Sequence, residues 1–117
     1  MPIAGRAEVR RVHRHGAGGP GIELVAGADA GVRAIAPGRV AFADRYDDYG
    51  LTILLDHGDR YYSVYANLAS ADVQVGQSIP AGGGLGKAGD DGRGRSLLYF
   101  EIRRGADVVD PAPWLGL

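Results

Sequence analysis

Histidines are the first residues here whose type and spacing suggest chemistry, because imidazole is a common zinc ligand and general base. His13 and His15 stand two apart, so a strand would place both on one face as half of a metal site. His57 precedes Gly58 in a predicted turn. A catalytic zinc needs about three convergent nitrogen or oxygen ligands, and no pattern brings three together. We therefore interpret His13 and His15 as exposed residues and His57 as a turn residue.

Nucleophiles and paired carboxylates give no stronger signal. The chain has no cysteine, and none of its serines lies in a Gly-x-Ser-x-Gly segment. Asp47-Asp48 and Asp90-Asp91 fall in predicted loops, where solvated acids are the simpler interpretation. The run from Gly82 to Lys87 superficially resembles a phosphate loop, but Ala88 follows the lysine where Ser or Thr is required. No catalytic residue is assigned from these patterns.

Composition limits the class of protein. The chain has 117 residues, a net charge of −1 and 45% hydrophobic residues, which is typical of one folded domain. It shows neither the basic excess nor the basic stripe of a nucleic-acid-binding protein. It contains no run of about 18 apolar residues and no recognisable signal peptide. We expect residues 1–117 to form a single domain.

Alternating apolar residues and frequent glycines predict many short strands joined by turns. In 97–104, Leu98, Phe100 and Ile102 share one face, and the other carries Leu97, Tyr99, Glu101 and Arg103. Strands are predicted at 7–12, 21–25, 31–35, 39–43 (Val40 and Phe42 inward), 51–55, 60–68, 72–75 and 97–104, with loops at 78–84 and 88–95 and hairpin-like turns at 36–38 and 57–59. The tail at 110–115 is expected to lay Trp114 onto the body. The fold class is therefore an antiparallel all-β domain.

Short motifs follow one another in a familiar order along nearly the whole chain. They are Gly21-Ile22-Glu23, Val32 to Val40, Tyr49-Gly50-Leu51, Asp56-His57-Gly58, Tyr65-Ala66-Asn67-Leu68, Val75-Gly76-Gln77, Tyr99 to Arg103 and Asp110-Pro111. Together they resemble a LytM (lysostaphin-like) zinc endopeptidase domain. The resemblance implies antiparallel sheets with a cleft, and few or no helices.

The sequence departs from this family where the family holds zinc. In active members, zinc is held by the histidine and aspartate of a His-x-x-x-Asp segment and by the second histidine of a His-x-His segment. Two further histidines, one in Tyr-Ala-His-Leu and the first of His-x-His, assist the catalytic water. By the resemblance, Gly19 and Glu23 stand at the first pair, Asn67 at the histidine of Tyr-Ala-His-Leu, and Leu97 and Tyr99 at His-x-His. One carboxylate cannot supply the ligands that zinc needs, so we expect no metal, no cofactor and no peptidase activity.

The closing stretch, Ser96 to Arg104 with Pro111 to Gly116, is similar to family members that activate murein hydrolases. Those domains use the degenerate groove to bind an N-acetylmuramoyl-L-alanine amidase and relieve its autoinhibition. The resemblance thus implies a non-catalytic activator of peptidoglycan amidases in cell division and cell separation, in the periplasm or bacterial cell envelope. The implied partner-binding groove is lined by Glu23, Tyr49, Asn67, Leu97, Tyr99 and Arg103, with Tyr49 and Tyr99 at its surface.

Two other functions stay open at this point. One is an active zinc endopeptidase acting on peptidoglycan cross-bridges, and the other is a passive module that binds peptidoglycan or a scaffold. We expect the chain to be the C-terminal fragment of a longer exported protein. An inhibitory segment, a coiled coil or a link to a membrane division complex would then lie outside it.

Overall fold

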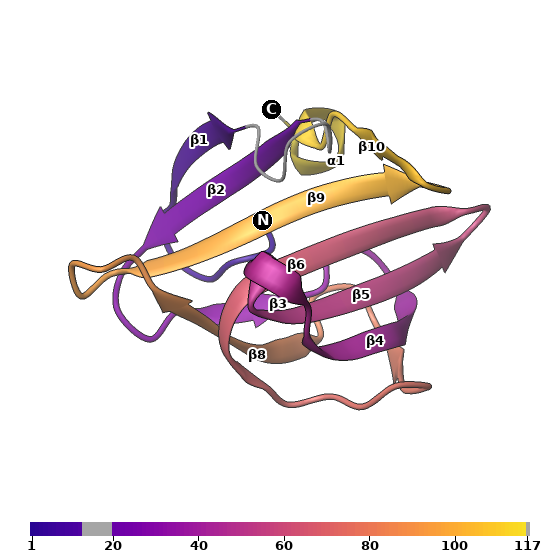
Figure 1. Cartoon of the computed structure of the whole chain (residues 1–117), viewed down its shortest axis with the longest axis horizontal. Coiled ribbons are helices and arrows are strands. Elements are labelled where there is room, and N and C mark those ends of the chain that lie inside the picture. The colour runs from indigo at the N-terminus through magenta and orange to yellow at the C-terminus, as the bar shows by residue number, and fades with distance from the viewer. Residues whose placement is uncertain (13–19, 117) are drawn as a thin grey trace.

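Antiparallel strands make up most of the protein (Figure 1). The computed structural model describes residues 1–12 and 20–116. Its helical segments are the 3₁₀ turn η2 (Asp47–Tyr49) and the short helix α1 (Ala112–Leu115), so the predicted all-β class is confirmed. The strands are β1 (Glu8–Val12), β2 (Gly21–Ala26), β3 (Gly31–Arg33), β4 (Gly38–Arg45), β5 (Leu51–Gly58), β6 (Tyr61–Ala71), β7 (Ser78–Ile79), β8 (Gly84–Asp90), β9 (Ser96–Arg104) and β10 (Asp107–Val109).

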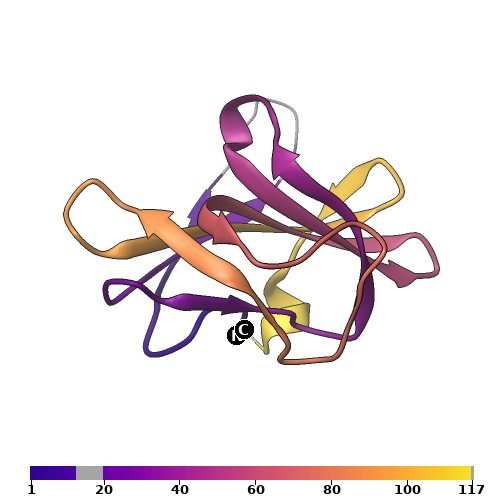
Figure 2. The same cartoon turned by 90° about the horizontal axis from the view of Figure 1, so that it is seen from below.

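The strands form one branched sheet in the order β1-β2-β9-β8-β6-β5-β4-β7, with β10 added to β9 and β3 to β8. Strand β6 is the centre of this arrangement, because it pairs with β5 along one edge and with both β9 and β8 along the other. Seen from below, β3 and β8 pass beneath the long strands, so the branched sheet encloses a core (Figure 2).

Asn67 marks the point where β6 changes partner. Ala66 is in register with Tyr99 of β9, whereas Leu68 is in register with Ala88 of β8. Between them Asn67 has a φ of 61°, in the left-handed region that asparagine tolerates better than most residues. The local backbone preference of this residue therefore helps β6 to turn from one layer to the other.

The inward faces of the strands build one main core. In β9, Leu98, Phe100 and Ile102 are fully buried in it, as the alternation predicted. Tyr65 of β6 packs its ring against Phe100 with the centroids 5.3 Å apart. The opposite face of the same strands carries a second, smaller cluster of Tyr49, Val64, Ala66 and Tyr99.

Several predicted elements are confirmed and others are wrong. The hairpin predicted around 57–59 is present between β5 and β6, with its turn at 59–60, and Trp114 lies on the body with its ring 5.3 Å from that of Tyr61. The turn at 36–38 joins no hairpin, because β3 pairs with β8 while β4 pairs with β5. Residues 72–75 lie outside the strands, and the glycine-rich segment 84–90, predicted partly as loop, is strand β8.

Phe42 lies on the opposite face from the one predicted. A register shift between Val40 and Phe42 puts Val40 opposite Leu55 and Phe42 opposite Leu54. Because side chains alternate along a strand, one extra residue moves the following side chains to the other face. Val40 stays in the core, and Phe42 moves to the outer face of the sheet. In the described residues, no helix has the length and apolar character needed to cross a membrane.

Candidate functional site

Of the positions that the resemblance aligns with zinc-site residues, the described ones are Glu23, Asn67, Leu97 and Tyr99, and they lie on the neighbouring strands β2, β6 and β9. Glu23 of β2 is in register with Tyr99 of β9, which is in register with Ala66 of β6 on its other side. The side-chain amide of Asn67 donates a hydrogen bond of 2.8 Å to the main-chain carbonyl of Leu97. His13, His15 and Gly19 lie outside the described residues.

These residues do not fit a zinc ion. Leu97 has no donor atom, and the Asn67 amide is already used as a donor to the backbone. The Tyr99 hydroxyl donates a hydrogen bond to the carboxylate of Glu101. Glu23 is the one acidic side chain among these four positions. Within residues 1–12 and 20–116, no three histidine, cysteine, aspartate or glutamate side chains lie close enough together to hold a metal.

Tyr99 is a buried supporting residue and not an exposed contact. We expected Tyr49 and Tyr99 at the surface of the groove, but their exposed fractions are 7% and 0%. The ring of Tyr99 occupies the space beside Gly21, where an added Cβ atom would come within 2.3 Å of its hydroxyl oxygen. The ring fits because residue 21 has no side chain, and it faces Tyr49 at a centroid distance of 5.8 Å.

A buried glutamate connects the tyrosines to Arg103. Glu101 is fully buried, and its Oε2 accepts hydrogen bonds from the hydroxyls of Tyr49 at 2.9 Å and Tyr99 at 2.5 Å. Its Oε1 accepts from Arg103 Nε at 3.0 Å, and Arg103 Nη2 donates to the Tyr49 hydroxyl at 2.8 Å. We call Tyr49, Tyr99, Glu101 and Arg103 the groove-side cluster. A buried carboxylate is tolerated when it is paired and hydrogen-bonded in this way.

The groove-side cluster keeps Tyr49 protonated. Burial, followed by the hydrogen bond to Glu101 and its negative charge, raises the pKa of Tyr49 to about 12. The phenol therefore donates to the carboxylate while its oxygen accepts from the guanidinium. Arg103 is thereby held in one direction although 31% of its side chain is exposed.

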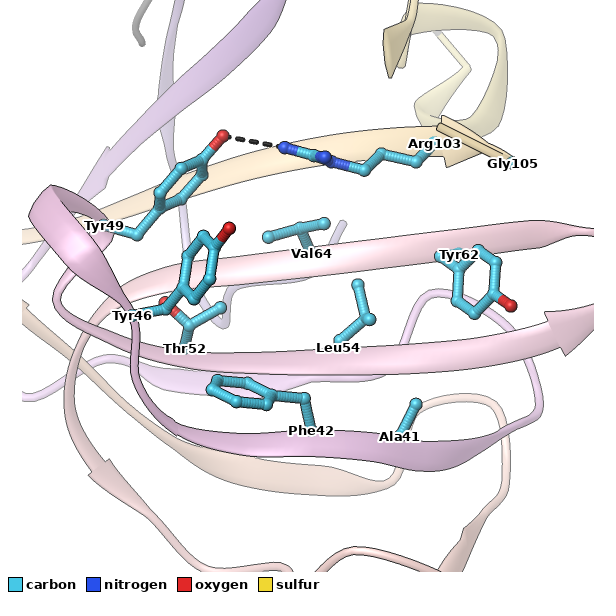
Figure 3. A pocket seen from close by; sticks show the side chains of 10 residues that line it. All are labelled: Ala41, Phe42, Tyr46, Tyr49, Thr52, Leu54, Tyr62, Val64, Arg103 and Gly105. Carbon is cyan, nitrogen blue, oxygen red and sulfur yellow. Dashed lines mark hydrogen bonds between the residues drawn. The ribbon is translucent and has the colours of Figure 1, made fainter. Parts of the chain in front are cut away.

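A groove of about 540 Å³ opens beside this cluster (Figure 3). Its floor and walls come from β4, β5, β6 and the 3₁₀ turn η2 with the preceding Tyr46, and Arg103 reaches it from β9. Of the six residues predicted to line a groove, Tyr49 and Arg103 line this hollow and Glu23, Asn67, Leu97 and Tyr99 do not. The lining residues are Ala41, Phe42, Tyr46, Tyr49, Thr52, Leu54, Tyr62, Val64, Arg103 and Gly105.

Aromatic rings form one side of the groove. Phe42 contacts Tyr46 at a centroid distance of 5.9 Å, and Tyr46 contacts Tyr49 at 5.6 Å. Sequence reasoning predicted Tyr49 at the groove but missed Phe42 and Tyr46, and the bulge that turns Phe42 outward has no clear pattern in the sequence. It also missed Glu101, although the alternation of β9 places Glu101 on the face that carries Tyr99 and Arg103. Chemically, the groove offers an apolar surface beside one fixed cation.

His57 belongs to a different cluster, on the core side of the sheet. Its Nδ1 donates to the Pro37 carbonyl at 2.7 Å, and its Nε2 lies 2.6 Å from Ser63 Oγ. Ser63 is 2.8 Å from the Tyr65 hydroxyl, which accepts from the Ile35 main-chain N–H at 3.2 Å. Ser63 and Tyr65 are fully buried and His57 is partly exposed, and the bonds of this core-side cluster support the fold. The sequence predicted His57 as a turn residue, but it lies in strand β5, because the hairpin turn is formed by the residues at 59–60.

Comparison with known proteins places this arrangement in a family. The model of peptidase family M23 matches residues 17–111. The chain is 46% identical over 96 residues to the murein hydrolase activator EnvC of Escherichia coli K12, covering 80% of this chain and 23% of EnvC. It is 32% identical over 99 residues to the murein hydrolase activator NlpD of the same strain, covering 84% of this chain and 26% of NlpD.

A solved structure gives the same result for the fold. The catalytic domain of the antimicrobial peptidase lysostaphin from Staphylococcus simulans superposes with a TM-score of 0.72 at 25% identity, over 83% of this chain and 78% of that one. The chain spans about a quarter of the length of the two activators described above. It belongs to peptidase family M23, the lysostaphin-like (LytM) domains, and is homologous to the murein hydrolase activators EnvC and NlpD.

Proposed function

We propose that this domain is a non-catalytic activator of peptidoglycan (N-acetylmuramoyl-L-alanine) amidases. In this proposal it acts in cell division and cell separation, in the periplasm or at the cell envelope. It binds the amidase through the outer face of the sheet, where the groove and the former ligand positions lie. The homology to proteins named murein hydrolase activators supports the class of function.

The observation that carries the proposal is what stands at the former ligand positions. Where an active member has histidines, this chain has an aliphatic residue at Leu97 and a buried tyrosine at Tyr99. Tyr99 is tied to Glu101, and Glu101 holds Arg103 at the edge of the groove. The face that would perform hydrolysis in a peptidase is thus built as a rigid support for a surface cation.

The chemistry of the groove suits a protein partner. Tyrosine and arginine are enriched among the residues that contribute most to protein–protein affinity, and the groove presents Tyr46, Tyr49 and Arg103 together. Phe42 and Leu54 add apolar area beside them. An amphipathic helix with an acidic side chain at one end would match this combination.

Activation then requires a preference for one state of the amidase. An activator shifts an equilibrium only by the difference between its affinities for the two states. In this proposal the groove binds the open state of the amidase more tightly than the inhibited state. It contacts either the inhibitory element or the amidase surface that this element uncovers when it moves away. The domain takes no part in the bond cleavage itself.

Dye release from labelled peptidoglycan tests this function. The domain alone should release no dye, the amidase alone should release little, and the two together should release much more. Release by the domain alone, with zinc bound stoichiometrically by mass spectrometry after dialysis against zinc, would make it an endopeptidase. Binding to purified sacculi without stimulation of any amidase would make it a passive module. Either result would contradict the proposal.

A further inference from the structure

Glu101 stands apart from the other residues of the groove face because it is charged and yet has no exposed surface. It does not line the groove, whereas its partners Tyr49 and Arg103 do. A bound protein therefore cannot touch Glu101. Any effect of this residue on binding has to pass through the two side chains that it holds.

The contacts of Glu101 leave Arg103 little freedom. Its Oε1 accepts a hydrogen bond from Arg103 Nε, and its Oε2 accepts hydrogen bonds from the hydroxyls of Tyr49 and Tyr99. The Tyr49 hydroxyl also accepts a hydrogen bond from Arg103 Nη2 (Figure 3). Together with the bond from Nε to Glu101, this fixes the guanidinium at two of its nitrogens. A free arginine side chain has many rotamers and loses that entropy when it binds. An arginine that is already ordered loses less, so the partner binds more tightly.

We propose that Glu101 is the positioning residue of the groove, which orders Arg103 and Tyr49 before the partner arrives. The inference rests on the proposed function, because it assigns a role in binding the amidase. In this proposal, a residue with no access to the partner sets the affinity for it. Tyr99 shares this supporting role, because its hydroxyl bonds to the same carboxylate oxygen as Tyr49.

The direct test is Glu101→Gln. Arginine has no acceptor atom, so the oxygen of the new amide must face Arg103 and its NH₂ group must face the tyrosine hydroxyls. Size is kept, but the negative charge is lost, and the hydroxyls of Tyr49 and Tyr99 lose the oxygen to which they donate. By NMR, the Nε–Hε signal of Arg103 should be sharp and slowly exchanging in the wild type and broadened in the variant. Affinity for the amidase that responds in the dye-release assay should fall about tenfold, as expected for losing one charge-assisted hydrogen bond.

Ser63→Ala is the matched control. Ser63 is equally buried but lies on the core side, where its hydroxyl contacts His57 and Tyr65. This variant should unfold at a lower urea concentration while the Arg103 signal and the amidase affinity stay at wild-type values. A role of Glu101 in stability alone would make the two variants behave alike.

Each outcome decides between the inference and the function on which it rests. If the wild type binds the amidase and Glu101→Gln binds equally well, or if the Arg103 signal is unchanged, the inference is overturned and the proposed function stands. If the wild type does not bind, the proposed function fails and the inference fails with it. Should Glu101→Gln not fold, Tyr49→Phe replaces it, because it removes the hydroxyl that accepts from Arg103 Nη2 and donates to Glu101 Oε2. Unchanged order and affinity in that variant would likewise overturn the inference.

Discussion

The two faces of the central strands each bury a cluster of hydrogen-bonded side chains, and the clusters differ in what they leave at the surface. The core-side cluster of His57, Ser63 and Tyr65 is bonded to main-chain groups of Pro37 and Ile35 and contains no carboxylate or guanidinium. The groove-side cluster is organised by the carboxylate of Glu101 and ends at the partly exposed side chain of Arg103. The first cluster supports the fold, whereas the second connects the interior to the surface that we propose binds the partner.

In the function proposed above, this difference is how a peptidase scaffold keeps its sheet and changes its chemistry. A buried carboxylate orders tyrosine and arginine on the groove side of the sheet. The following variants test whether the two faces are separable in this way.

Tyr99→Ala should have the largest effect, and on stability first. The fully buried ring fills the space beside Gly21, and large-to-small changes of buried aromatic residues cost about 3–5 kcal/mol of unfolding free energy. Urea unfolding followed by circular dichroism measures this loss. Tyr99→Phe, which removes only the hydroxyl, should cost about 1 kcal/mol. If the alanine variant costs no more than the phenylalanine variant, the ring is not the packed support described here.

Arg103→Glu should abolish amidase stimulation and leave the domain folded. The change replaces the groove cation by an anion next to Glu101, and truncating or reversing a partly buried interfacial charge costs about 2–5 kcal/mol of binding free energy. Arg104→Glu is the matched control, because it makes the same charge change one residue along β9, on the side where Arg104 packs over the Tyr61 ring. Equal stimulation by the two variants would remove Arg103 from the binding site.

Alkaline pH should weaken the fold through both clusters. The pKa of Tyr49 is raised to about 12 by burial and by Glu101, and that of Tyr65 is raised to about 12 by burial. Since these folded-state values exceed the unfolded value of 10.0, the stabilisation is complete below that pH and is lost as pH rises towards 12. Each tyrosine should cost about 1.4 kcal/mol of unfolding free energy at a pH about one unit above its unfolded pKa.

Two phenylalanine variants sharpen this comparison. Tyr49→Phe and Tyr65→Phe should each flatten the alkaline decline in urea-unfolding free energy, because each removes one titrating phenol. Only Tyr49→Phe should also lower the affinity for the amidase, since Tyr65 lies on the core side. A loss of affinity in Tyr65→Phe would show that the two faces are coupled.

The sequence predicted the class of fold because its alternating strands and turn residues carry that information locally. Strand β8 was harder to predict, because its glycines are typical of loops. They are needed for close approach: a Cβ atom on Gly86 would come within 2.0 Å of the Ser70 carbonyl oxygen. That requirement arises only when β6 and β8 pair. Residues 72–75 alternate like a strand, yet they lie outside the strands of the structure.

The candidate site could be predicted only in part. Alternation along 97–104 predicted that Tyr99, Glu101 and Arg103 share one face, and their hydrogen bonds agree with this, but the burial of Tyr99 depends on Gly21 of a neighbouring strand. Phe42 reached the groove through a register shift, which depends on strand pairing. Both are tertiary effects, and no local pattern in the sequence reports them.

Chemical-shift mapping of the isotope-labelled domain, titrated with the unlabelled amidase, tests the central claim most directly. The account predicts that perturbed backbone amides cluster around the groove, at Phe42, Tyr46, Leu54, Val64 and Arg103. Amides of Val32 in β3 and Leu85 in β8, whose side chains lie in the main core, should stay at their free positions. Perturbations centred on β3 and β8, with the groove unchanged, would contradict the account.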